Sequence, residues 1–149
     1  MQRRIALWIV AGVLLCLLAW RTGRAAESLT ITEITYGAGY DLIRWDWISN
    51  PSGASSGDTI DATYTGRLIW VVQMPDAGGT QPTNAYDVTI LDENGVDVLN
   101  GLGANISNLA NSTKTESEKL GAMVSSPLHY VVQNAGDSNG GSTIIVIGK

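Results

Sequence analysis

Alternation of apolar and polar residues at the period of a β-strand is the feature that most restricts the fold of this sequence. Residues Leu29–Tyr36 alternate in this way, and a glycine-rich turn follows them. Tyr40–Ser49 resumes the pattern and places Ile43, Trp45 and Trp47 on one face of a strand. We expect this aromatic face to point into a core.

Further strands are predicted along the rest of the chain. Asn50–Gly57 is dense in turn-forming residues and predicts an exposed loop, and Thr59–Thr65 then predicts a short strand. Leu68–Val72 is an uninterrupted β-branched and aromatic run, which is typical of a strand buried on both faces at the centre of a fold. The last two strands are expected at Leu128–Gln133 and Thr143–Ile147.

A hairpin is the most specific local prediction. Tyr86–Asp92 and Val96–Leu99 are expected to pair through Asn94–Gly95, the dipeptide preferred in a type I′ turn because both central residues need positive φ. Gly101–Gly121 lacks a period of two, so we expect a long loop with one helical turn there. Loops of this length commonly carry function.

Seven or eight short strands punctuated by glycine-rich turns predict an all-β fold. The architecture is expected to be an antiparallel β-sandwich or a jelly-roll-like barrel, preceded by an N-terminal hydrophobic signal helix. Residues 27–149 are long enough for a single β-sandwich domain and too short for two.

The first 26 residues resemble an export segment. A basic start, Met1–Arg4, precedes the uncharged run Ile5–Trp20, and small residues near Ala26 offer a cleavage point. The run is shorter than the ~20 residues of a comfortable transmembrane helix, which favours a cleaved signal peptide. Arg21 and Arg24 follow the run and disfavour translocation, so an uncleaved signal anchor stays open, with membrane contact only through residues 1–26.

The charge distribution excludes one class of partner. The chain beyond Ala26 holds five basic and 14 acidic residues, a formal charge of −9. Such a surface repels phosphate backbones, so we expect no nucleic acid partner. The single cysteine, Cys16, lies in the export segment, so no disulfide is expected in the domain.

Few residues could support catalysis, and we predict a protein that is not an enzyme and has no cofactor. His129 is the only histidine and lies in an apolar strand pattern, where an ordinary hydrogen bond is its expected role. Asp41 and Asp46 are the least arbitrary acid pair, but they fit a strand end and a solvent face better than glycoside hydrolysis. Asp92–Asp97 gathers oxygen ligands without EF-hand spacing, so a solvated turn is expected there and no metal site.

Candidate binding residues come from the aromatic side chains and the long loop. Trp45 and Trp47, if exposed, could stack on sugar rings, whereas buried tryptophans would supply core volume, which is the commoner outcome. Asn105 and Asn111 in the 101–121 loop complete a hypothetical glycan- or protein-binding set.

From about Leu29 onward the chain resembles small, β-rich proteins encoded by tailed bacteriophages and prophages near their virion genes. The resemblance implies a non-enzymatic virion-associated accessory protein, such as a capsid decoration, that contacts other virion proteins and works as a homo-oligomer. The alternative is an exported module of the periplasm or cell envelope that binds a glycan or an envelope protein. The stretches that carry the resemblance are Ile34–Gly37, Ile43–Trp47, Tyr64–Ile69, Pro75–Asp76, Pro82–Thr89, Asp97–Leu99, Gly103–Asn105 and Val132–Gly136.

Overall fold

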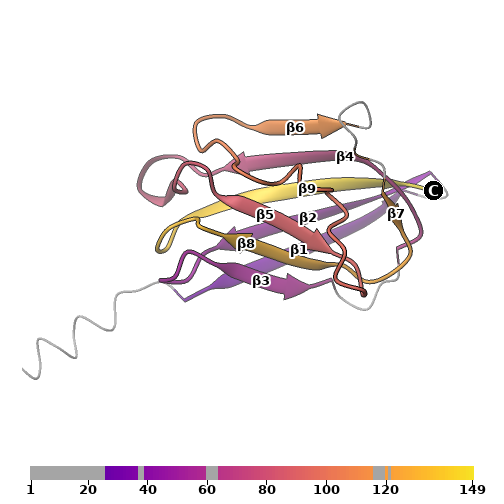
Figure 1. Cartoon of the computed structure of the whole chain (residues 1–149), viewed down its shortest axis with the longest axis horizontal. Coiled ribbons are helices and arrows are strands. Elements are labelled where there is room, and N and C mark those ends of the chain that lie inside the picture. Colours follow the sequence, from indigo (N-terminus) through magenta and orange to yellow (C-terminus); the bar gives the residue numbers. More distant parts are fainter. Residues whose placement is uncertain (1–25, 37–38, 60–63, 116–119, 121) are drawn as a thin grey trace, which may run out of the picture.

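Two antiparallel β-sheets face each other in the described part of the chain, which is all-β, with the buried side chains between them (Figure 1). The computed structural model describes residues 26–36, 39–59, 64–115, 120 and 122–149. The predicted signal or anchor segment, residues 1–26, lies outside the described residues except for Ala26. In the described part of the chain, no helix is long and apolar enough to cross a membrane.

The large sheet has the strand order β1-β2-β9-β4-β6, and a short strand, β7, also pairs with β4. β1 and β9 run in the same direction, because each pairs with β2 in antiparallel register. Ser28 at the start of β1 and Gly148 at the end of β9 therefore lie at opposite ends of the sheet. The strands are β1 (Ser28–Tyr36), β2 (Tyr40–Ile48), β9 (Gly140–Gly148), β4 (Gly66–Pro75), β6 (Ser112–Thr115) and β7 (Met123–Val124).

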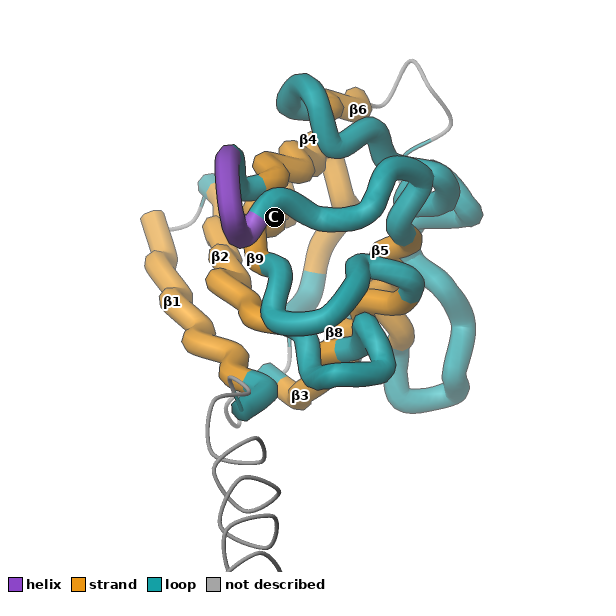
Figure 2. Tube along the Cα trace, turned by 90° about the vertical axis from the view of Figure 1, so that its left-hand side faces the viewer, coloured by secondary structure: helices purple, strands orange, loops and turns teal. Residues whose placement is uncertain are grey.

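The small sheet has the order β3-β8-β5 and packs against one face of the large sheet (Figure 2). Its strands are β3 (Ser55–Asp58), β8 (His129–Gln133) and β5 (Asp87–Leu91). A 3₁₀ turn, η1 (Gly78–Thr80), follows β4. Because the large sheet is wider, its inner face at β6 extends beyond the strands of the small sheet.

The core confirms the predicted inward face of β2. Ile43 and Trp45 are fully buried and Trp47 is 2% exposed. The Trp45 ring stacks on Tyr130 of β8, with 5.0 Å between centroids and 10° between planes. Trp47 packs at a tilt against Tyr86, at 5.7 Å. The first contact joins the two sheets across the core, and the second joins the large sheet to the residue that precedes β5.

A chain of buried polar side chains also joins the sheets. The Tyr130 hydroxyl lies 2.6 Å from Thr143 Oγ1, and Thr143 Oγ1 donates to Gln73 Oε1 at 2.5 Å. Since Thr143 has one hydroxyl hydrogen, Tyr130 is the donor of the first bond. Burial raises the pKa of Tyr130 well above its ordinary value, so its hydroxyl keeps the proton that it donates.

The predicted centre of the fold needs correction. β4 extends from Gly66 to Pro75, with a bulge between Leu68 and Trp70, but β9 occupies the middle of the large sheet. Val71 and Val72 are buried on opposite faces, whereas Trp70 is only half-buried. The prediction that Leu68–Val72 is buried on both faces is thus only partly confirmed.

The predicted type I′ hairpin is wrong in two respects. Gly95 has φ +77°, but Asn94 does not have the positive φ that a type I′ turn requires. Val96–Leu99 forms no strand and contributes only an isolated bridge between Leu91 and Asp97. Two backbone bonds close the turn: Asp92 N–H donates to Val96 O and Gly95 N–H donates to Asp92 O, both at 3.0 Å.

Three short strands were not predicted. Ser55–Asp58 was expected in a loop but pairs with β8, and Ser112–Thr115 was expected in the 101–121 loop but pairs with β4. β7 was missed altogether. Of the predicted strand Thr59–Thr65, residues 60–63 lie outside the described chain, while Thr59 N–H continues the ladder by donating to Leu128 O at 2.9 Å. The predicted helical turn is absent from residues 101–111, which form turns.

Candidate binding recess beside the 101–111 loop

The part of the large sheet that the small sheet leaves uncovered is covered by a loop. β6 pairs Lys114 with Val71 and Ser112 with Gln73, so both β6 side chains lie on the inner face. Above them passes the 101–111 loop, which connects the region after β5 to β6. The loop fills this space incompletely and leaves a recess of about 490 Å³.

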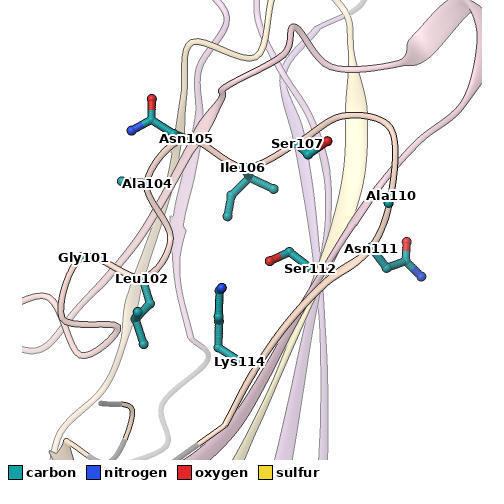
Figure 3. A pocket seen from close by; sticks show the side chains of 10 residues that line it. All are labelled: Gly101, Leu102, Ala104, Asn105, Ile106, Ser107, Ala110, Asn111, Ser112 and Lys114. Atoms are coloured by element: carbon teal, nitrogen blue, oxygen red, sulfur yellow. The ribbon is translucent and has the colours of Figure 1, made fainter. Parts of the chain in front are cut away.

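The recess has a mixed lining. Ile106, Ser112 and the Lys114 ammonium point toward one another from three sides (Figure 3). Such a lining offers a cation, a hydroxyl and an apolar wall to an occupant. The lining residues are Gly101, Leu102, Ala104, Asn105, Ile106, Ser107, Ala110, Asn111, Ser112 and Lys114.

Hydrogen bonds to the preceding segment hold the loop in place. Ile106 N–H donates to Tyr86 O at 2.7 Å, and Ala85 N–H donates to Ile106 O at 3.0 Å. Further along, Gln81 Nε2 donates to Asn108 O at 2.7 Å. The recess therefore has a wall that is fixed by backbone bonds before any ligand arrives.

A glycine permits the closest approach of this loop to the small sheet. Val88 N–H of β5 donates to Gly103 O at 2.7 Å. A Cβ at position 103 would lie 2.0 Å from Val88 O, so any side chain would push the loop away from β5. Gly103 thus helps to set the position of the recess.

The structure brings two of the four predicted binding residues to this recess. Asn105 and Asn111 both line it, but their amide groups point away from its centre (Figure 3). Asn105 has φ +54°, a conformation that asparagine tolerates better than most residues, and its N–H donates to Asp87 Oδ1 at 2.8 Å. These asparagines form an exposed rim, and Asn105 also shapes the loop.

The other two predicted binding residues are elsewhere. Trp45 and Trp47 lie in the core between the sheets, so the hypothesis that they form a surface row for sugar rings is wrong for this conformation. The commoner of the two expected outcomes, in which the tryptophans fill the core, is confirmed.

Lys114 and Ser112 are the functional candidates that the binding prediction lacked. Their segment shows no apolar alternation, so it gave no strand signal, and without a strand the inward direction of their side chains could not be derived. The available sign of an edge strand was the alternation of threonine at positions 113 and 115, since threonine is enriched in strands.

The titratable residues weighed for catalysis are distributed over separate places. His129 Nδ1 lies 2.7 Å from Asp58 Oδ1 on the outward side of the small sheet, where the Asp58 side chain is 78% exposed. Asp41 faces inward and its Oδ1 lies 2.9 Å from Lys149 Nζ. Asp46 faces outward on the same strand, so the two aspartates do not form an acid pair.

The acidic turn after β5 uses its carboxylates to hold its own backbone. Asp92 Oδ1 accepts from the N–H groups of Asn94 at 2.9 Å and Val96 at 2.8 Å. Asp97 accepts from Leu99 at 3.0 Å and from Gly101 at 2.8 Å. No group of three or more His, Cys, Asp or Glu side chains able to hold a metal ion occurs among the described residues.

Comparison with known proteins adds little to this geometry. No protein-family model matches the sequence, and no curated protein matches it either. Among solved structures, a cupin domain from Bordetella pertussis Tohama I is similar at 12% sequence identity and a TM-score of 0.32. The alignment covers 85% of this chain and 99% of that chain. A likeness this slight carries no inference about fold or activity.

Proposed function

We propose that this chain is a non-enzymatic accessory structural protein of a tailed-phage particle, of the capsid-decoration kind, that acts by contacting other virion proteins. The resemblance of its sequence to phage-encoded β-rich proteins supports this role. The single structural observation that favours it is the recess beside the 101–111 loop. Its wall is held by backbone hydrogen bonds of the 101–111 loop, and its lining offers apolar, hydroxyl and ammonium groups to a neighbouring protein.

The chemistry of the recess suits a protruding segment of a neighbouring protein. An aliphatic group would pack against Ile106 and Leu102, while a carboxylate would meet the Lys114 ammonium. Insertion of an acidic and apolar segment would also place the partner beside the exposed Asn105 and Asn111 rim. Contacts of this kind join proteins without any chemical reaction.

The first test is the location of the native protein. Intact mass would be measured in purified virus particles and in the cell envelope of the producing bacterium. We expect the chain in the particles at a constant copy number. Its absence from particles, together with a species beginning near Glu27 in the periplasm, would overturn the virion role.

Two variants that add negative charge at different places test the recess. We expect Lys114→Glu to lower incorporation into particles at least tenfold, because it places a negative charge where the partner's carboxylate binds. Gln133→Glu also adds a negative charge, at an exposed outward position of β8 outside the recess lining, and should be incorporated normally. Equal incorporation of both variants would exclude the recess as the docking site.

The alternative function is an exported envelope module that binds a glycan in the same recess. The exposed amide groups of Asn105 and Asn111 favour a glycan that lies across the rim, because amides and hydroxyls are the usual hydrogen-bonding partners of sugars. The leader-like residues 1–26 are consistent with export. Titration with candidate glycans, followed by the chemical shifts of the two asparagine amides, would separate this role from the virion role.

A further inference from the structure

The outward side of the large sheet carries an apolar surface that crosses four strands. Side chains at paired positions of antiparallel strands lie on the same face of a sheet. One continuous row of such positions is apolar from the edge strand to β4. In order, it consists of Ile34, Leu42, Val146 and Trp70.

Neighbouring positions extend this row in both directions along the strands. Ile144 and Val72 form the next pair on the same face. Exposure is greatest toward the margins, at 40% for Ile34, 39% for Tyr40 and 37% for Ile48, and the small sheet lies on the opposite side (Figure 2). The outer patch is Ile34, Tyr40, Leu42, Ile48, Trp70, Met74, Ile144 and Val146, and Val72 on the same face is only 7% exposed.

The charges on this face nearly balance, in contrast with the acidity of the rest of the domain. Arg44 Nε donates to both carboxylate oxygens of Asp46 at 2.9 Å, and Arg44 Nη2 donates to Ser142 Oγ at 3.1 Å. Asp46 is the only acidic residue at the described outward positions of the large sheet, and Arg67 lies at one end. Two copies that met through this face would therefore avoid most of the repulsion expected from a formal charge of −9.

The size of the face is sufficient for a stable dimer. Four strands of nine or ten residues together with the four-residue β6, at ~4.8 Å spacing and ~3.3 Å per residue, give a footprint of roughly 600–700 Å². Two such footprints bury about 1,200–1,400 Å² in total, within the range of specific protein interfaces.

We propose that the outer patch packs against the same patch of a second copy of this chain, as two large sheets stacked face to face about a two-fold axis. A two-fold interface uses one self-complementary surface, and this face is apolar with an internally paired Arg44 and Asp46. Because Arg44 is paired with Asp46, the middle of this face offers little net charge to a strongly charged partner. The two sheets would lie about 10 Å apart, as in the packing of β-sandwiches. The inference goes beyond the particle role and does not depend on it.

Sedimentation of three forms of the full chain tests the proposal. Wild type is compared with Ile144→Lys, at the middle of the outer patch, and with Val131→Lys, a half-buried outward position on β8 of the small sheet. All three carry the same N-terminal segment, so association through that segment is common to them. We expect Ile144→Lys to weaken the dimer at least 100-fold and Val131→Lys to leave it unchanged.

Near-ultraviolet circular dichroism confirms that each variant is folded, and Leu42→Lys serves as a second patch variant if Ile144→Lys does not fold. Dimers that persist in folded patch variants would overturn the proposal. A monomeric wild-type chain would also overturn it. If, in addition, only the patch variants lost incorporation into particles, the patch would bind a different protein.

Discussion

The outward faces of the two sheets differ in a way that the inward faces do not. Both inward faces are apolar and meet in one core. On the small sheet, the central strand β8 directs His129, Val131 and Gln133 outward. This is the ordinary alternation of a strand that has one solvent-exposed face. On the large sheet, the central strand β9 directs Ile144 and Val146 outward instead. Folding accounts for one apolar face per sheet, so the second apolar face of the large sheet requires another explanation.

The difference teaches how to interpret an uninterrupted apolar strand. Such a run predicts a strand covered on both sides, and the covering layer need not belong to the same chain. Leu68–Val72 and Ile144–Ile147 are both runs of this kind, and both lie in the large sheet beneath the outer patch.

The largest effect is expected from truncating the inward face of each sheet. Ile145 of β9 and Ile90 of β5 are both fully buried, but β9 is paired on both sides whereas β5 is an edge strand. We expect Ile145→Ala to lower the free energy of unfolding by about 4 kcal/mol and Ile90→Ala by about 3 kcal/mol, because an edge strand can partly collapse into the cavity. Urea denaturation measures both. A larger loss of unfolding free energy for Ile90→Ala than for Ile145→Ala would contradict the expectation that the large sheet is the less able to relax around a cavity.

A smaller effect is expected from removing the polar link between the sheets. Thr143→Val keeps the shape of the side chain but removes the hydroxyl group to which the Tyr130 hydroxyl and the Gln73 amide are hydrogen-bonded. We expect a loss of roughly 1–3 kcal/mol in the free energy of unfolding. Thr89→Val, at an outward position of the small sheet, is the matched control and should change stability by less than about 0.5 kcal/mol. Equal effects would mean that the buried link contributes nothing specific.

The smallest effect concerns the ion pair of the outer patch. The hydrogen bond from Arg44 lowers the pKa of Asp46, so the stability that it contributes is present above the unfolded pKa of about 4 and is lost as the pH falls through the folded pKa. Because the Arg44 and Asp46 side chains are 43% and 39% exposed, solvent screening limits the contribution to under ~1 kcal/mol.

Urea denaturation of the wild type and Asp46→Asn at several pH values measures this contribution. The variant should be slightly less stable at pH 7, and the two proteins should converge in acid. Asp58→Asn, on the small sheet, should have a smaller effect at pH 7, since Asp58 is 78% exposed. A difference that grows as the pH falls would contradict the assigned direction of the Asp46 pKa.

Local patterns were enough to predict the long strands and their inward faces. Trp45 and Trp47 alternate with charged residues, so burial of one face of β2 followed from the period alone. The short strands β3 and β6 could not be predicted, because Ser55–Asp58 and Ser112–Thr115 are extended only where β8 and β4 offer them a ladder. Strand order also depends on contacts far apart in the sequence, such as β2 with β9.

The candidate site was predictable only as a region. The long loop after β5 was expected to carry function, and it does form one wall of the recess. The inward direction of Lys114 required knowledge that β6 is a strand and that it lies beyond the edge of the small sheet. The left-handed backbone at Asn105 likewise decides the shape of the loop, and no sequence pattern specified it.

The direction of the strands that contain the two ends of the described domain has a mechanical consequence. Ser28 and Gly148 lie at opposite ends of the ladder formed by β1, β2 and β9. A pull on these two ends therefore acts along the strands, at right angles to the backbone hydrogen bonds between them. All the rungs then bear the load together in shear, whereas a hairpin pulled open from one end breaks its rungs one after another. A domain tethered at one end and pulled from the other would resist force through its longest strands.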